Sequence, residues 1–408
     1  MPTRFRLRLP AVDVPLALAA IALVTFGLLV VYSATSVPGA HEGLWTKQLM
    51  WALIALAAAC VAAAIHHRAY DSLAYPFYGI SLLLLIAVLV AGSSAMGAKR
   101  WLDLGPIRFQ PSELAKLATV LMLARRFDNP KLDLTRMRYW LPALLLTLVP
   151  FALVAREPDL GTALSFPVIL VTMYYWAGMP LGHLLLGLSP VFNAVLFFAT
   201  GSLWWFAGLL ALLLAGVRPR VTALVTVLLL NGAVAYALPH VWNHMHDYQK
   251  RRIETFMNPG ADPYGAGYQI IQSQIAIGSG GAAGKGYLKG SQKALSFLPM
   301  RHTDFIYSVV GEELGFIGAL TVVLLYAVII VRGIRLAVVT RNGFASLLAV
   351  GLVSALFFQI MVNMLMTIGW APVTGLPLPL LSYGGTALLV NGIQIGLLQN
   401  VALRRKEL

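Results

Sequence analysis

The chain contains a single cysteine and few charged residues. One cysteine, Cys60, excludes an intrachain disulfide, and its place in an apolar run indicates a simple packing role. Only 11% of the 408 residues are charged, whereas 59% are hydrophobic. Soluble domains carry about 25% charged residues. The composition therefore predicts a polytopic membrane protein.

Basic stretches with interleaved aromatic residues, which would indicate a nucleic-acid-binding module, are also missing. The formal net charge is nevertheless +14, and the positive residues collect at the ends of apolar runs. Membrane proteins orient themselves by such a distribution. We therefore attribute the positive charge to membrane topology and expect no nucleic-acid partner.

Twelve apolar segments approach or reach the roughly 20 residues that a membrane-spanning helix needs. They predict an all-α fold, a polytopic transmembrane helical bundle. The segments are Val14–Tyr32, Gln48–Ile65, Ala74–Val90, Pro111–Ala124, Tyr139–Val154, Leu160–Trp176, Leu181–Thr200, Leu203–Ala215, Val221–Leu238, Phe305–Val331, Phe344–Thr367 and Thr386–Leu403. The pair within residues 181–216 is the weakest. Deleting both of its segments leaves ten spans with the same sidedness.

Basic residues follow the second, fourth, eighth, tenth and twelfth segments, as expected where a span ends in the cytoplasm. With the Arg-rich N-terminus also inside, both termini are predicted to be cytoplasmic. Residues 91–110 and 239–304 then form external loops.

Residues 239–304 include the only long polar connection, and we expect the chemistry there. Asp262 and Glu254 are the only carboxylates between Asp247 and Asp304. The cations around them are Lys250, Arg251, Arg252, Lys285, Lys289, Lys293 and Arg301. An acid among so many cations indicates an anionic substrate, a phosphate, and one carboxylate left for proton transfer.

Further candidate residues lie around two predicted helix starts. Lys99 and Arg100 lie in the first external loop. Glu113 and Lys116 are three residues apart, so they can pair on one helix face, in a structural or a functional role. Asp159 lies in the next external turn, where capping of the following helix is its simpler role.

The glycine-rich run GSGGAAGKG, residues 278–286, does not match a nucleotide-binding loop. Ser279 stands where that pattern needs Gly, and Gly286 stands where it needs Ser or Thr. A turn of main-chain amides that binds a pyrophosphate is the alternative that stays open.

The tenth segment is preceded by Arg301 and His302, and Glu312 lies about two turns into it. A hydrogen-bonded structural histidine is the simpler interpretation, and help in placing a cation is the other. Glu312 is followed by a second glutamate, and adjacent residues cannot share one helix face, so at least one faces a polar cavity. Ser382 lies in GLPLPLLSYGGTALL, whose irregular backbone indicates a polar cleft that opens outward.

The strings RFQPSELAKL, REPDLGTAL, DPYGAGYQIIQSQIAIGSGG, LPMRHTDFIYSVVGEELG and LPLPLLSYGGTAL occur in this order. Together they resemble the SEDS family of cell-wall polymerases over nearly the whole chain. HDYQKRRI and RHTDF are more similar to its elongation branch than to its division branch. The resemblance implies one SEDS-type domain, residues 1–408, in the bacterial cytoplasmic (inner) membrane. Its core has ten spans, so residues 181–216 become an extra helical hairpin.

The resemblance also implies peptidoglycan glycosyltransfer, which joins the disaccharide units of lipid II into strands during cell elongation and cell-shape maintenance. In the family the acid of the DP-x-G-x-GYQ loop is catalytic, and here it falls on Asp262. An inverting displacement with Asp262 as general base on the attacking hydroxyl fits one essential carboxylate. The implied partners are a class B penicillin-binding protein and elongation-complex proteins, and we look for a docking face on Phe344–Thr367.

The departing pyrophosphate needs its charge neutralised, by protein cations or by a divalent cation such as Mg²⁺ or Mn²⁺. The candidate substrate-binding residues are Lys99, Arg100, Glu113, Lys116, Asp159, Lys285, Arg301, His302, Glu312 and Ser382. Two other classes compete. A lipid II or lipid-linked sugar flippase would place its site near the midplane of repeated halves. A noncatalytic scaffold would not depend on Asp262.

Overall fold

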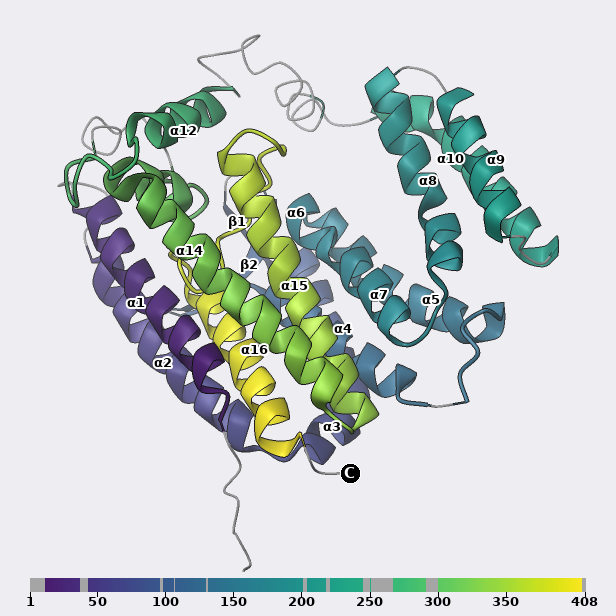
Figure 1. The fold of residues 1–408 in the computed structure, drawn as a ribbon, viewed down its shortest axis with the longest axis horizontal. Helices are drawn as coiled ribbons and strands as arrows, with labels where there is room; N and C mark the ends of the chain where they lie inside the picture. Colours follow the sequence, from purple (N-terminus) through teal and green to yellow (C-terminus); the bar gives the residue numbers. More distant parts are fainter. Residues whose placement is uncertain are drawn as a thin grey trace, which may run out of the picture.

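A computed structural model describes residues 12–36, 43–95, 98–105, 107–129, 131–200, 204–217, 221–244, 250, 267–290 and 300–405. Helices dominate it, as the apolar segments predict (Figure 1). The helices of the first half are α1 (Val14–Thr35), α2 (Leu44–Ala64), α3 (His67–Ala91), α4 (Pro111–Phe127), α5 (Met137–Arg156), α6 (Leu160–Ala163) and α7 (Ser165–Trp176). Those of the second half are α8 (Leu181–Thr200), α9 (Trp204–Val217), α10 (Val221–His244), α12 (Tyr268–Ser279), α14 (Ile306–Val339), α15 (Gly343–Thr367) and α16 (Gly385–Arg404).

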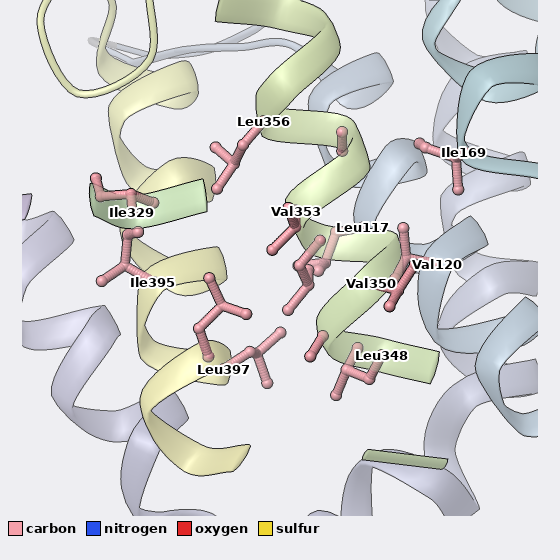
Figure 2. Close-up of a cluster of buried hydrophobic side chains, with 14 of the residues drawn as sticks. Leu117, Val120, Ile169, Ile329, Leu348, Val350, Val353, Leu356, Ile395 and Leu397 are labelled. Carbon is pink, nitrogen blue, oxygen red and sulfur yellow. The ribbon is translucent and has the colours of Figure 1, made fainter. Parts of the chain in front are cut away.

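Helix α15 forms the centre of the bundle. It contacts α4, α7, α14 and α16, and most of its apolar side chains are buried. Figure 2 shows residues of α15 such as Val350 and Val353 packed among Leu117 of α4, Ile329 of α14 and Leu397 of α16. The prediction of a partner-docking face on residues 344–367 is therefore wrong for most of this helix. An apolar sequence alone does not distinguish a central helix from a lipid-facing one.

The chain is confirmed as a multi-pass membrane protein by its helix lengths. Within the described part, seven helices are long and apolar enough to cross a bilayer, namely α1, α2, α3, α5, α14, α15 and α16. Helix α4 has 17 residues, and the sixth predicted span is divided at Leu164 into α6 and α7. The count of ten core spans stays a prediction. Cys60, to which we assigned a simple packing role, is exposed on the surface of α2.

Residues 181–200 and 204–217 fold as two helices, α8 and α9, and α8 packs against both α9 and α10. Leu186, Leu210 and Val227 form a small separate core between them. Asn231 of α10 donates to Ser189 Oγ of α8 at 2.8 Å, a buried polar contact between the two helices. Figure 1 shows the three helices on the opposite side of the bundle from α1 and α2. That the hairpin is additional to a ten-span core stays a prediction.

A three-stranded sheet and a helix within the predicted external loops were missed. Residues 91–110 contain three short antiparallel strands, β1 (Ser93–Ala95), β2 (Ala98–Leu104) and β3 (Ile107–Phe109). Thr386 at the start of α16 donates to the carbonyl of Arg108 at 2.9 Å, which fixes this sheet against the bundle. Within residues 239–304, α12 is a regular helix that packs on α14.

Candidate functional site

The start of α4 holds a buried ion pair. Pro111 occupies the first turn, where its missing N–H costs nothing. Glu113 and Lys116 follow on one face, and their carboxylate and ammonium lie 2.9 Å apart with only 1% and 2% of the side chains exposed. This confirms the pairing predicted from their spacing. Lys116 also donates to Gln359 Oε1 of α15 at 3.2 Å, so the pair is tied to the central helix.

Gln359 and Asn363 continue this chain of contacts toward the loop before α16. Gln359 donates to the carbonyl of Pro377 at 2.9 Å, and Asn363 donates to that of Leu376 at 2.7 Å. The two side chains are four residues apart, so they project from one face of α15. A polar side chain inside an apolar helix is costly unless it is hydrogen-bonded, and these amides hold an irregular loop backbone in place.

Ser382 is the second anchor of this loop. Its hydroxyl donates to the carbonyl of Thr303 at 2.6 Å and accepts from the N–H of Leu378 at 2.8 Å. Gln48 of α2 donates to the Ser382 carbonyl at 3.0 Å. We call Glu113, Lys116, Gln359, Asn363 and Ser382 the polar network. It joins α4, α15 and the loop at residues 375–384 at one end of the bundle.

Asp159 lies at the same end, in the turn between α5 and α6. Its carboxylate accepts from Thr162 N at 3.3 Å and from Thr162 Oγ1 at 2.9 Å, so it caps α6 as predicted. Gln110 Nε2 donates to Asp159 Oδ2, the oxygen that also accepts from the Thr162 hydroxyl, at 3.2 Å. Arg100 of β2 lies 3.9 Å from it and donates to the carbonyls of Glu157 and Pro158. Arg100 thus binds this turn.

Glu157, in the same turn, was not predicted as a site residue. Its side chain is 1% exposed, and neither carboxylate oxygen has a hydrogen-bond partner among the described residues. The pKa of Glu157 is raised to about 8, first by burial and then by the negative charge of Asp159, while the positive charge of Arg100 acts in the opposite direction. At neutral pH this carboxyl is therefore largely protonated. The sequence signal was two acids separated by one residue beside an arginine.

Lys285, Glu312 and their neighbours form a second group, around α12 and α14. The Lys285 ammonium lies 2.8 Å from Glu312 Oε1. The Glu313 carboxylate accepts from Ser33 Oγ of α1 at 2.6 and 2.7 Å and from the N–H of Leu288 at 3.3 Å. Both glutamates are buried and bound by protein groups, and the expectation that at least one of them faces a polar cavity stays a prediction.

The glycine-rich run docks on α14. The N–H groups of Lys285 and Gly286 donate to the carbonyls of Glu312 and Glu313 at 3.0 Å each. A side chain on Gly284 would overlap the Glu313 backbone, which explains the glycine there. These two amides therefore bind main-chain carbonyls, and the alternative that the run cradles a pyrophosphate is wrong for them.

Arg301 and His302 connect the second group to the first. Arg301 is 4% exposed, and its Nε donates to the Ala34 carbonyl at the end of α1 at 2.9 Å. The N–H of Tyr383 donates to the His302 carbonyl at 2.9 Å, and the two rings meet edge to face at 5.7 Å. His302 is thus placed by the same loop as Ser382.

Two sequence-predicted residues are not placed in full. Asp262 lies outside the described residues. Lys99 lies in β2, opposite Ser94 of β1. Among the residues that the structure describes, no three His, Cys, Asp or Glu side chains are grouped to hold a metal ion.

The arrangement as a whole defines a class of protein. Long apolar helices surround a central helix, and buried ion pairs and amides gather at one end of the bundle. These features belong to a multi-pass membrane protein with a polar site at one end of its helical bundle. A family model described as Cell cycle protein, covering the FtsW, RodA and SpoVE proteins, matches residues 14–204 and 194–407. The chain belongs to this family, which confirms the resemblance to SEDS proteins.

Individual relatives agree over nearly full length. Peptidoglycan glycosyltransferase MrdB of Escherichia coli is 39% identical over 397 residues, which cover 97% of this chain and 95% of that protein. Probable peptidoglycan glycosyltransferase FtsW of Geobacter metallireducens is 34% identical over 422 residues, covering 100% and 99%.

Two solved structures are similar in fold. One is a chain from a structure described as showing structural coordination of polymerization and crosslinking by a peptidoglycan synthase complex. It is 33% identical to this chain, with a TM-score of 0.74. The match covers 97% of this chain and 99% of that chain. Rod shape determining protein RodA of Thermus thermophilus is 30% identical with a TM-score of 0.66, covering 97% and 98%.

Proposed function

We propose that this chain is a peptidoglycan glycosyltransferase that polymerises lipid II into glycan strands during cell elongation. The observation that carries the proposal is the full-length similarity to MrdB, a protein named for this activity. The motifs that first suggested the family, around Glu113, Asp159 and Ser382, meet at one end of the bundle. Lipid II presents its sugar and pyrophosphate at a membrane surface, where this end would lie.

The proposed location is the bacterial inner membrane with both termini in the cytoplasm and residues 239–304 outside. Support comes from the basic residues that follow alternate apolar segments. Arg125 and Arg126 end α4, and Arg404 ends α16, at the opposite end from the polar network. The polar network and the glycine-rich run then face the side on which glycan strands are made.

Asp262 is the proposed general base. It would take the proton from the attacking sugar hydroxyl as that oxygen displaces the pyrophosphate at the anomeric carbon, with inversion. The polar network holds the 375–384 loop through main-chain carbonyls, and Arg301 and His302 lie on its border. We assign these groups the role of a rigid frame for substrate, because their hydrogen bonds run to backbone as much as to side chains.

The ion pairs limit which cations are available to neutralise the charge of the leaving pyrophosphate. Lys116, Lys285 and Arg100 already face the carboxylates of Glu113, Glu312 and Asp159. A phosphate would have to compete with these partners. We therefore propose Lys99 and the exposed side of Lys285, which is 30% accessible, as first contacts, with a divalent cation near Asp262 as the further possibility to test.

The partner is proposed to be a class B penicillin-binding protein. The similar chain in a peptidoglycan synthase complex that couples polymerization to crosslinking supports this assignment. A partner of this kind crosslinks the strands that the polymerase makes. Because most of α15 is buried, we propose that the partner docks on other helices.

The test is incubation of the purified chain with lipid II, with and without divalent metal and the partner, followed by separation of glycan products. Asp262→Asn keeps the shape of the side chain and removes its charge. We expect it to reduce polymerisation about 100- to 10,000-fold, the usual contribution of a positioned base. Glu254→Gln, in the same loop, is the matched control and should retain activity.

Two outcomes would contradict the proposal. Polymerisation by Asp262→Asn at the wild-type rate would remove the base assignment. Movement of lipid II across vesicle membranes without any glycan product would instead identify a flippase.

A further inference from the structure

A second polar site lies at the far end of the bundle from the polar network. A cavity of about 590 Å³ opens between the start of α1 and the ends of α14 and α16. Its lining residues are Asp13, Arg332, Arg335, Leu336, Val339, Arg341 and Arg405. We call it the cationic pocket. Its volume lies within the range of roughly 300–1,000 Å³ that is typical of small-molecule sites.

The floor of the cationic pocket is fixed by contacts among three helices. Asp13 caps α1, and its carboxylate accepts from Nε and Nη2 of Arg332 on α14 at 2.9 and 2.5 Å. Gln399 of α16 exchanges two hydrogen bonds with the backbone of Asp13, each 2.9 Å long. A buried carboxylate with a forked arginine and a matched amide makes a rigid base. The pocket is therefore a built feature of the fold.

The charges that face the cavity are unbalanced. Among the described residues, four guanidinium groups and one carboxylate line it, an excess of three positive charges. Arg335 and Arg341 are exposed and have no hydrogen-bond or ion-pair partner among the described residues, and Arg405 acts on Asp13 at longer range. Lys and Arg at the ends of spans are an ordinary orientation signal. Their convergence on a cavity with a fixed floor is not needed for orientation.

An apolar surface leads into the cationic pocket along α14. Val331, Ile334, Val338 and Val339 are between 44% and 65% exposed. Their spacing places them, with Arg335, on one stripe of the helix, because residues three, four, seven and eight apart share a face. Val339 belongs to both the stripe and the pocket lining. A ligand that fills both would have an anionic head and apolar tails.

We infer that the cationic pocket binds the phosphate headgroup of an anionic phospholipid, whose acyl chains lie along the α14 stripe. Guanidinium groups bind phosphate in forked pairs, and basic pockets between transmembrane helices take anionic headgroups. Free inorganic phosphate offers the same charge but nothing for the stripe to bind. Helix α14 runs from the end of the bundle that holds the polar network to this pocket. A lipid bound here would therefore contact the far end of the helix that also carries Glu312 and Glu313.

The experiment uses the whole chain purified in neutral detergent. Short-chain phosphatidylglycerol, phosphatidylcholine with the same chains, and inorganic phosphate are titrated separately, and the apparent melting temperature is followed. Phosphatidylglycerol should raise it with a saturable midpoint, because a ligand of the native state stabilises that state. Phosphatidylcholine and inorganic phosphate should not reproduce the shift at the same concentrations.

The informative variant is Arg335→Gln with Arg341→Gln. Each arginine near a membrane surface contributes about a fivefold factor to anionic-lipid affinity, so the double variant should need about 25-fold more phosphatidylglycerol. Lys131→Gln with Arg138→Gln removes the same charge from the same end of the bundle outside the pocket, and should keep the wild-type midpoint. If the double variant aggregates, Arg341→Gln alone should shift the midpoint about fivefold.

Three results would overturn the inference: an equal shift with phosphatidylcholine, an unchanged midpoint in the pocket variants, or a full shift with inorganic phosphate alone. The last would reassign the pocket to a free anion. None of these results depends on glycan synthesis, so the lipid site and the proposed reaction stand or fall separately.

Discussion

The buried pair of Glu113 and Lys116 allows a quantitative prediction. Replacing Lys116 by Met leaves the Glu113 carboxylate with no cation in a place where only 1% of it meets solvent. Water cannot replace the lost ammonium group at this buried position. Gln359 presents an acceptor oxygen to Lys116, and an acceptor oxygen cannot stabilise a carboxylate. Removing one partner of a buried pair costs about 3–5 kcal/mol. The double change Glu113→Gln with Lys116→Met removes both charges and should cost only about 1–2 kcal/mol.

The assay compares the apparent melting temperatures of the wild type, both single variants and the double variant in one detergent. Arg136 and Asp133 provide a matched control, since they are also three residues apart, with N and O atoms at 2.8 Å, but are 51% and 40% exposed. Arg136→Met should lower the apparent melting temperature much less than Lys116→Met does, because exposed pairs contribute little to stability.

Polymerisation of lipid II by the same four proteins separates structure from chemistry. If the double variant recovers both stability and glycan synthesis, the pair serves only the fold. If it recovers stability alone, the pair takes part in substrate binding or in catalysis. Wild-type stability in Lys116→Met would refute the burial argument, as would a double variant that loses the sum of both single effects.

Three further changes have definite expected outcomes. Glu157→Gln should flatten the pH dependence of stability. Because the pKa of Glu157 is raised from 4.5 to about 8 in the folded state, the wild type loses on the order of 4 kcal/mol of stability as the pH rises between these values. Melting curves from pH 5 to 9 should therefore show the variant as the more stable protein only at the alkaline end. Gly315→Ala should lower the melting temperature and expose the glycine-rich run to protease. Gly315 has φ 64° and ψ −158°, and a Cβ there would overlap that run. Gly79→Ala is the control, because Gly79 has open space around it. Asp13→Ala should destabilise the chain by about 1–3 kcal/mol, since it removes an N-cap and the hydrogen bonds that Asp13 accepts from Arg332, which is 25% exposed. Equal melting temperatures of variant and wild type would contradict this.

Local patterns in the sequence determined several features correctly. Apolar runs fixed the positions of the long helices to within a few residues at many ends, as for α15 and α16. A spacing of three residues predicted the pair of Glu113 and Lys116, and a turn position predicted the cap by Asp159. These features depend on neighbours within one helical turn, so the order of residues is sufficient.

Tertiary structure alone decided which of these elements meet. It placed α15 at the centre of the bundle rather than on a lipid-facing side. It also paired Lys285 with Glu312 and packed the glycine-rich run against α14. It also buried Glu157 with no hydrogen-bond partner among the described residues. Asp13 and Arg332, far apart in sequence, were brought together at the floor of the cationic pocket. Burial and long-range pairing depend on how helices pack, and an apolar run or a charge carries no record of the helix that will lie against it.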